Sequence, residues 1–165
     1  MKFSDLAVRL AVTPFGAMLD RYVVRFLGHS PVSWVFAKSE NVDYNAPILL
    51  TSRGRKTGRA RTVVLPHFRA GDGRIAVVGS RGGAPIDPHW ARNLRAHPEA
   101  RIWLDRRAIE VDVQLAEGAA REPLWASITK RSPVYLVYQD RAAGHREIPV
   151  FVLTAKDGSP LSAPE

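Results

Sequence analysis

Between positions 47 and 153 the apolar residues form short runs that are separated by turn residues. One run, residues 109–115, alternates strictly between apolar and polar positions, which is the pattern of a strand with one buried face. The other runs are mostly apolar or β-branched, and they cover residues 48–51, 62–65, 75–78, 100–104 and 149–153. Breaks such as Gly71-Asp72-Gly73 suit tight connections, so the pattern predicts antiparallel strands. Six such strands in one small domain favour a barrel.

Helical signals occur in three segments. Apolar residues recur at helical spacing between Phe3 and Leu27 and predict a helical arm with a bend near Pro14. Residues 87–96 start with Asp87 as an N-cap and Pro88 at the first helical position, which predicts a short helix. Residues 117–130 form a further helical candidate, whereas residues 30–46 show no period and are expected to be a connecting loop.

The length of the chain supports one domain. With 165 residues, of which 45% are hydrophobic, the chain can close one core but is short for two. We divide it into an N-terminal helical arm with its connecting loop (1–46), a barrel domain (47–155) and a flexible tail (156–165). The arm has two interpretations: it packs on the domain or on a second subunit, or it lies on a membrane surface as a basic amphipathic segment.

The net charge of +8 indicates an anionic partner, and nucleic acid, anionic lipid and phosphorylated small molecules all fit it. Because the chain contains no cysteine, a disulfide framework and cysteine-ligated metals are excluded, and redox chemistry would need a bound cofactor. The five histidines lack metal-ligand spacing and the carboxylates do not cluster, so we expect no metal. There is no apolar run of about 20 residues and no signal peptide, so the expected compartment is the cytoplasm.

A basic connection joins the first two expected strands. Five cationic residues lie there within nine positions: Arg53, Arg55, Lys56, Arg59 and Arg61. Their side chains, together with backbone amides, can converge on a phosphate or a carboxylate. The spacing does not match that of a P-loop, and a solvated hairpin is the alternative interpretation.

A glycine-rich bend, residues 79–85, follows the third expected strand and precedes the helix at 87–96. Gly82 and Gly83 permit a positive φ or the close approach of a planar ligand, and Ser80 would place its hydroxyl there. The following helix presents His89, Trp90 and Asn93 near its N-terminal end, where an anion or a polar ring edge is favoured.

Two tyrosines near the C-terminal part are a further candidate. Tyr135 and Tyr138 lie three positions apart, so on a helix they would share a face. They would then wall a pocket or donate protons, and packing in the core is the alternative.

The order of these segments resembles the deazaflavin-dependent nitroreductase and quinone reductase family, the split β-barrel proteins that use coenzyme F420. The resemblance spans about Pro47 to Leu153, and the region of Tyr135, Tyr138 and Ile148-Pro149-Val150 also resembles the family. The motifs that carry it are Leu50 to Gly58 with Arg61-Thr62, Val77 to Pro85, Pro88, Trp90, Asn93-Leu94 and Pro98. It implies an α+β, mainly β fold: a split β-barrel of the FMN-binding type with about six antiparallel strands, flanking helices and an N-terminal helical arm.

The resemblance further implies an oxidoreductase that transfers a hydride from reduced coenzyme F420 to an electron-poor acceptor, such as a quinone or a nitroaromatic. FMN is the alternative cofactor. The basic connection would bind the phosphodiester and the polyglutamate tail of the coenzyme. The implied catalytic residues, which would stabilise or protonate the reduced acceptor, are Ser80, Tyr135 and Tyr138. The implied cofactor-binding residues are Arg55, Lys56, Thr57, Arg61, Thr62, Val63, Val64, Leu65, Pro66, Val78, Gly79, Ser80, Arg81, His89, Trp90, Ala91, Arg92, Asn93 and Tyr135.

Other functions stay open at this point. One is a carrier that binds a flavin-like ligand without turnover, and another is a nucleic-acid-binding barrel that stacks bases on Trp34, Trp90 or Trp103. The aromatic residues are not interleaved with the basic run, which argues against nucleic acid. The resemblance leaves room for a homodimer and for a peripheral contact between the N-terminal helix and the inner face of the cell membrane.

Overall fold

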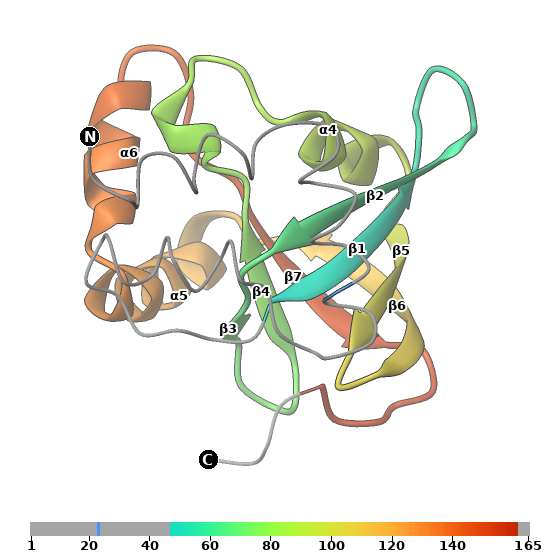
Figure 1. Cartoon of the computed structure of the whole chain (residues 1–165). Helices are drawn as coiled ribbons and strands as arrows, with labels where there is room; N and C mark the ends of the chain where they lie inside the picture. The colour runs from blue at the N-terminus through green and yellow to red at the C-terminus, as the bar shows by residue number, and fades with distance from the viewer. Residues whose placement is uncertain (1–22, 24–46, 162–165) are drawn as a thin grey trace.

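The computed structural model describes residue 23 and residues 47–161. Within this part of the chain the strands pair antiparallel in one curled sheet, in the order β2-β1-β5-β6-β7-β4-β3 (Figure 1). The strands are β1 (Ile48–Arg53), β2 (Ala60–Leu65), β3 (Phe68–Arg69), β4 (Ile75–Val78), β5 (Glu99–Leu104), β6 (Arg107–Leu115) and β7 (Val150–Ala155). Between residues 47 and 161 the helices are α4 (His89–Ala96), α5 (Gly118–Arg131), α6 (Val134–Ala142) and the 3₁₀ helix η1 (Arg81–Gly83).

The predicted antiparallel split barrel with flanking helices is confirmed. The expected strands are all present, and β3 is an additional one. It contains only two residues and pairs with β4 alone, so no apolar pattern marks it in the sequence. The helix that carries Tyr135 and Tyr138 is α6.

The strand patterns reflect which faces of the sheet are covered. In β6, Ile109, Val111 and Val113 are buried and the polar residues between them are exposed, because one face of this strand packs on the core. In β4 the residues of both faces are buried, since Ile75 and Val77 join one core cluster and Ala76 and Val78 join another. A continuous apolar run is therefore the expected pattern for β4.

Two core clusters lie on the two faces of the sheet. The first gathers the inward residues of β1, β5, β6 and β7 and closes over them with Trp90 and Leu94 of α4. The second joins β4 and β7 to α5 and α6, which lie together at one side of the sheet in Figure 1. The packing thus holds α4 beside the β1–β2 hairpin and α6 beside η1.

The predicted helix at 87–96 is present as α4, but its predicted N-cap is wrong. Pro88 occupies the N-cap position, and no side chain caps the helix. The Asp87 carboxylate instead accepts from the guanidinium of Arg146 at 2.8 Å and lies 3.4 Å from Nε of Arg95. Each arginine binds a different oxygen of this carboxylate, and a charge-assisted hydrogen bond is stronger than a bond to a neutral amide.

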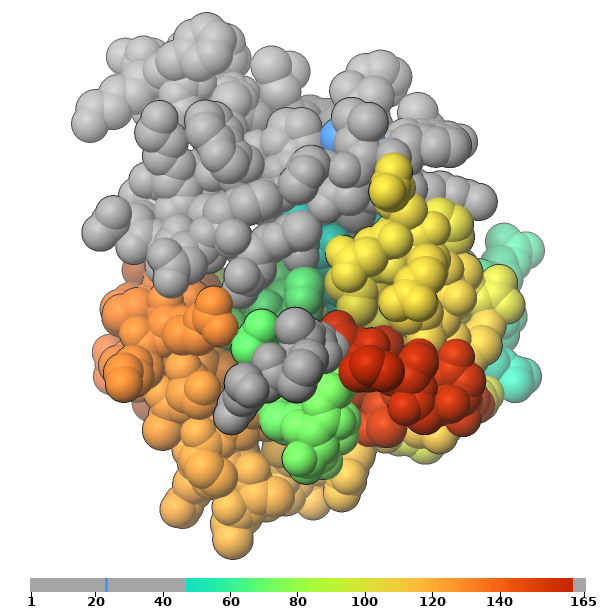
Figure 2. All heavy atoms as spheres, turned by 90° about the horizontal axis from the view of Figure 1, so that it is seen from below, coloured from blue at the N-terminus to red at the C-terminus, as the bar shows by residue number. Residues whose placement is uncertain are grey.

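Residues 156–161, which we expected to belong to a flexible tail, pack against the barrel. Leu161 is buried, and its amide donates to the carbonyl of Gly73 at 2.6 Å. Lys156 pairs with Glu99 of β5 at 2.9 Å. In Figure 2 the end of β7 and the residues after it (red) lie beside the β5–β6 hairpin (yellow). Except for residue 23, the predicted N-terminal arm and its loop lie outside the described residues.

Candidate functional site

The basic connection is a closed turn between β1 and β2. The amide of Gly54 donates to the carbonyl of Arg59 at 2.8 Å, and the amide of Gly58 donates to the carbonyl of Gly54 at 2.7 Å. These bonds hold the turn compact, so the cationic side chains of residues 53–61 stand together at one end of the sheet. The charge that the sequence concentrates in a few residues is therefore concentrated in space as well.

The turn is fastened to α4 through a buried amide side chain. Asn93 Oδ1 accepts from the backbone amide of Arg55 and from its guanidinium, each at 3.2 Å. Asn93 Nδ2 donates to Oγ of Ser52, on β1, at 3.4 Å. Asn93 is only 4% exposed, so its hydrogen-bonding capacity is directed at the hairpin rather than at water. This contact sets the distance between the hairpin and the helix.

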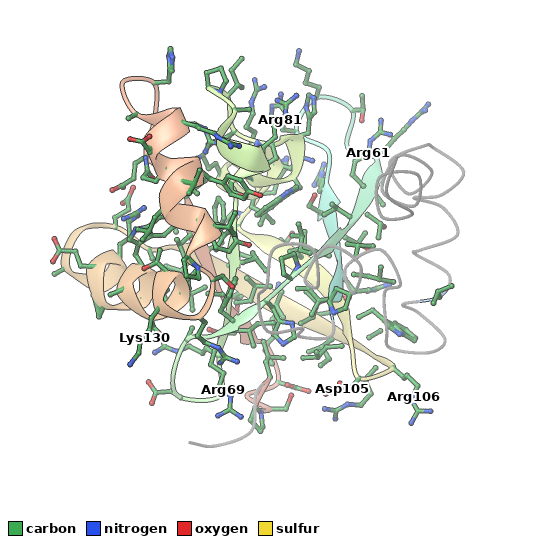
Figure 3. All side chains as sticks on the ribbon, turned by 60° about the vertical axis from the view of Figure 1, so that its left-hand side comes forward. Arg61, Arg69, Arg81, Asp105, Arg106 and Lys130 are labelled. Atoms are coloured by element: carbon green, nitrogen blue, oxygen red, sulfur yellow. The ribbon has the colours of Figure 1, made fainter. Side chains whose placement is uncertain are left out.

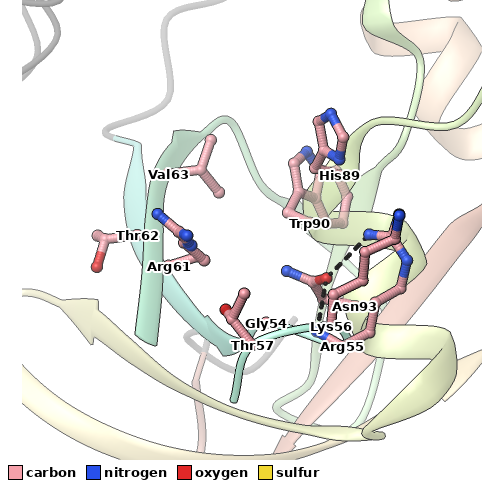
Figure 4. A pocket seen from close by; sticks show the side chains of 10 residues that line it. All are labelled: Gly54, Arg55, Lys56, Thr57, Arg61, Thr62, Val63, His89, Trp90 and Asn93. Atoms are coloured by element: carbon pink, nitrogen blue, oxygen red, sulfur yellow. Dashed lines mark hydrogen bonds between the residues drawn. The ribbon is translucent and has the colours of Figure 1, made fainter. Parts of the chain in front are cut away.

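A cavity of 530 Å³ lies between the hairpin and the helix. In Figure 4 Val63 of β2 lies across the cavity from His89 and Trp90 of α4, Thr62 points away from it, and the turn residues lie at its lower end. Val63 and Trp90 supply apolar wall, and Lys56 and Arg61 supply positive charge. The lining residues are Gly54, Arg55, Lys56, Thr57, Arg61, Thr62, Val63, His89, Trp90 and Asn93.

The positive charge at this cavity is not neutralised within the described part of the chain. Among residues 47–161, no ion pair involves Arg55, Lys56 or Arg61. Figure 3 shows Arg61 and Arg81 at one end of the molecule, with Arg106 and Lys130 at the opposite end. Three cations held close together without carboxylates favour an anionic ligand.

Nine of the predicted cofactor-binding residues line this cavity together. They are Arg55, Lys56, Thr57, Arg61, Thr62, Val63, His89, Trp90 and Asn93. Gly54 also lines it and was absent from the predicted set, although it belongs to the basic motif. The predicted residues that do not line the cavity are Val64, Leu65, Pro66, Val78, Gly79, Ser80, Arg81, Ala91, Arg92, Tyr135 and Tyr138.

The glycine-rich bend has the expected backbone, with φ of +64° at Gly82 and +81° at Gly83. Some of its amides are already bonded: that of Gly79 donates to the Pro149 carbonyl at 2.9 Å, and that of Gly83 to the Ser80 carbonyl at 3.0 Å. A planar ligand can therefore meet only the other amides of the bend. Ser80 is half-buried, and its hydroxyl makes no hydrogen bond to residues 47–161.

The two tyrosines share a face of α6, as their spacing predicts, and their rings meet edge to face with centroids 5.9 Å apart. Tyr135 also contacts Phe68 and Trp125 and is 7% exposed. Burial, and to a smaller extent the neighbouring Tyr138, raises the pKa of Tyr135 above its ordinary value. Tyr135 therefore belongs to the aromatic core and stays protonated at neutral pH.

The described residues bear on further expectations from the sequence. Trp90 is 8% exposed and packs against Phe151 with ring centroids 5.8 Å apart, so most of its ring is covered by the core and little is left for a base to stack on. Trp34 lies outside the described residues. Within residues 47–161 no three histidines, aspartates or glutamates gather as metal ligands. In the same part of the chain, none of the helices has the length and apolar character that a bilayer crossing requires.

Known proteins resemble this chain over the same region. The family model described as F420H(2)-dependent quinone reductase matches residues 37–155. The F420H(2)-dependent quinone reductase of Mycobacterium tuberculosis is 33% identical over 114 residues, which cover 66% of this chain and 73% of that protein. A putative F420H(2)-dependent quinone reductase of Mycobacterium bovis shows the same identity over the same shares of the two chains.

Solved structures agree with the sequence comparison. An F420-H2 dependent reductase, FDR-A, superimposes with a TM-score of 0.57 at 31% identity, covering 65% of this chain and 92% of that one. A chain described as a domain-swapped dimer gives a TM-score of 0.58 at 29% identity, covering 75% of this chain and 99% of that one. Since the family model spans most of the chain, and the cationic cavity lies inside the matched region, this protein belongs to the F420H(2)-dependent quinone reductase family of F420-dependent oxidoreductases.

Proposed function

We propose that this chain reduces quinones with a hydride from reduced coenzyme F420, and that nitroaromatic compounds are further acceptors. Membership of the family supports the coenzyme and the quinone. The observation that carries the proposal is the cavity in which Arg55, Lys56 and Arg61 lie, with no carboxylate partner among residues 47–161, beside the apolar side chains of Val63 and Trp90.

The residues present fit the coenzyme. Its phosphodiester and polyglutamate tail are anionic, and Arg55, Lys56, Thr57 and Arg61 offer cations and a hydroxyl on one turn. Its tricyclic ring is flat, and Val63 and Trp90 line the cavity with apolar side chains against which a flat ring can pack. A cavity of 530 Å³ lies within the range of about 300–1,000 Å³ that is usual for small-molecule sites. We assign these residues to the binding of the coenzyme. The other predicted cofactor-binding residues between Thr62 and Arg92 would surround it.

When bound, the reduced coenzyme supplies a hydride, which is the chemistry that the polypeptide itself lacks. The hairpin and α4 hold the ligand between two elements whose spacing Asn93 determines. A quinone that gains a hydride carries one negative charge on oxygen and needs one proton to become the hydroquinone. Ser80, whose hydroxyl has no partner within residues 47–161, is our candidate to donate a hydrogen bond to that oxygen.

The roles of the two tyrosines follow from their surroundings. Because Tyr135 is buried among aromatic rings and holds its proton tightly, we place it in the support of the site. Tyr138 is half-buried on the same face of α6 and remains a candidate for contact with the acceptor. A homodimer is a further proposal, supported by the similar chain described as a domain-swapped dimer. A cytoplasmic location and a peripheral membrane contact through the N-terminal helix stay predictions.

The test is a fluorescence titration of the protein with oxidised coenzyme F420, beside a titration with FMN. We expect saturable binding of the deazaflavin and much weaker binding of FMN. Reoxidation of the reduced coenzyme by menadione and by a nitroaromatic compound then separates an enzyme from a carrier. Absence of saturable F420 binding would contradict the proposal, and binding without turnover of either acceptor would indicate the carrier.

A further inference from the structure

The side chain of Arg146 forms several hydrogen bonds with the segment between β4 and α4. Its guanidinium donates to three carbonyls, those of Gly79 at 3.1 Å, Ser80 at 2.7 Å and Ala84 at 2.8 Å. It also donates to the Asp87 carboxylate at 2.8 Å. Both side chains of this ion pair are mostly buried, with 10% of Arg146 and 16% of Asp87 exposed. One side chain thus holds both ends of the glycine-rich bend.

Arg146 is itself held in place by α6. Gln139 Nε2 donates to the Arg146 carbonyl at 3.2 Å, and Gln139 Oε1 accepts from the Ile148 amide at 2.8 Å. The Arg146 amide donates to the Ala142 carbonyl at 3.1 Å. Its backbone is therefore fastened on both sides before the guanidinium reaches across to the bend, so little conformational entropy remains to be lost.

These contacts reach the cavity through α4. Asp87 lies two residues before His89 and three before Trp90, which both line the cavity. At the other end of the bend, Ser80 carries the hydroxyl that we assign to the acceptor. A planar guanidinium can bind several oxygens at fixed angles, whereas a lysine ammonium lacks this fork. The placement of Ser80 and of the first turn of α4 therefore depends on an arginine at position 146.

We propose that Arg146 is a positioning residue for the reaction: it sets the placement of Ser80 and of the first turn of α4 relative to the basic hairpin. This inference rests on the proposed function. It also separates two contributions to catalysis. The hairpin cations bind the coenzyme, and Arg146 determines whether the bound molecules are aligned, which changes turnover more than affinity.

Arg121 offers a matched control. It is also a buried arginine and contacts the same segment, since it donates to the Ile148 carbonyl at 3.1 Å and lies 3.2 Å from the Glu147 carboxylate. In the described structure it makes no hydrogen bond or ion pair with the bend. A substitution of Arg121 therefore weakens the packing of α5 without releasing Ser80 or α4.

The experiment compares Arg146→Lys and Arg121→Lys with the wild type in F420 titration, in thermal unfolding and in steady-state turnover with menadione. For Arg146→Lys we expect kcat to fall on the order of 10- to 100-fold, with the Kd for the coenzyme changed less than about threefold. For Arg121→Lys we expect a lower Tm and an unchanged kcat per folded molecule. Added guanidinium ion should partly restore kcat in Arg146→Ala, whereas ammonium should not.

A kcat that stays at the wild-type value in Arg146→Lys overturns the inference and leaves the proposed function intact. The inference is equally overturned if both lysine variants lose kcat and Tm in parallel, since the effect is then structural. A wild type that neither binds nor turns over the coenzyme overturns the proposed function and this inference with it.

Discussion

Asn93 accepts two hydrogen bonds from Arg55, one from the backbone amide and one from the guanidinium, each at 3.2 Å. The two residues belong to α4, which forms one side of the cavity, and to the β1–β2 turn, which lies at its end. This pair orients a positive side chain without neutralising it, because an amide oxygen carries no net charge. The site therefore combines a rigid frame with an available cation.

Removal of the Asn93 amide should weaken this frame. Asn93→Ala leaves the Arg55 amide and Ser52 without their buried partner, so the free energy of unfolding should fall by about 1–3 kcal/mol. Affinity for coenzyme F420 should fall as well, because the turn is no longer held beside α4. Urea unfolding measures the first effect and fluorescence titration the second. Gln114→Ala, on the exposed face of β6, is the control, and its stability should change by less than about 0.5 kcal/mol.

Loss of a single cavity cation should lower coenzyme affinity. Lys56→Ala and Arg61→Ala each remove one charge-assisted contact, so we expect the Kd to rise about 10-fold, which corresponds to roughly 1.4 kcal/mol. Added salt should weaken binding less in these variants than in the wild type. Lys130→Ala removes the same charge from the far end of the molecule and should leave the Kd unchanged. Equal losses in Lys56→Ala and Lys130→Ala would show that only the net charge matters.

The two glycines of the bend should differ in their tolerance of a side chain. A Cβ at Gly83 would lie 2.6 Å from the Tyr138 carbonyl and 2.7 Å from Arg141 Cβ, at a φ of +81°. A Cβ at Gly82 would meet nothing within 4 Å, at a φ of +64°. We expect Gly82→Ala to lose about 1–2 kcal/mol from the left-handed backbone alone, and Gly83→Ala to lose more. If the two variants had equal midpoints of urea unfolding, the expected clash between a side chain at position 83 and α6 would be contradicted.

The raised pKa of Tyr135 predicts that the protein loses stability at high pH. Burial raises the pKa of its hydroxyl above the ordinary value, so above about pH 10 the unfolded chain releases a proton that the folded chain keeps. The stabilisation is complete below about pH 10 and is lost as the pH rises further, by up to about 1.4 kcal/mol per pH unit. Urea unfolding from about pH 9 to about pH 11 should show a shallower decline in Tyr135→Phe than in the wild type. Parallel declines would show that Tyr135 does not titrate in this way.

Much of the barrel could be predicted from the sequence because the signals are local. The alternation in residues 109–115 and the continuous apolar runs at 75–78 and 149–153 each follow from the faces that their own strands cover. The two-residue strand β3 left no such pattern. Asp87 shows the limit of local reasoning. Its position before Pro88 favours an N-cap, but its carboxylate accepts a hydrogen bond from Arg146, which lies 59 positions away in the chain.

The sequence by itself determined the antiparallel class of the sheet, the concentration of positive charge on one turn and the resemblance to F420-dependent reductases. These properties depend on residues that are close together in the sequence, so they can be recognised without knowing the tertiary structure. Only the tertiary structure decided which candidates share a cavity, that Tyr135 lies in the aromatic core, and that one arginine holds both ends of the glycine-rich bend. Those relationships join residues far apart in the chain, and sheet order and helix packing bring them together.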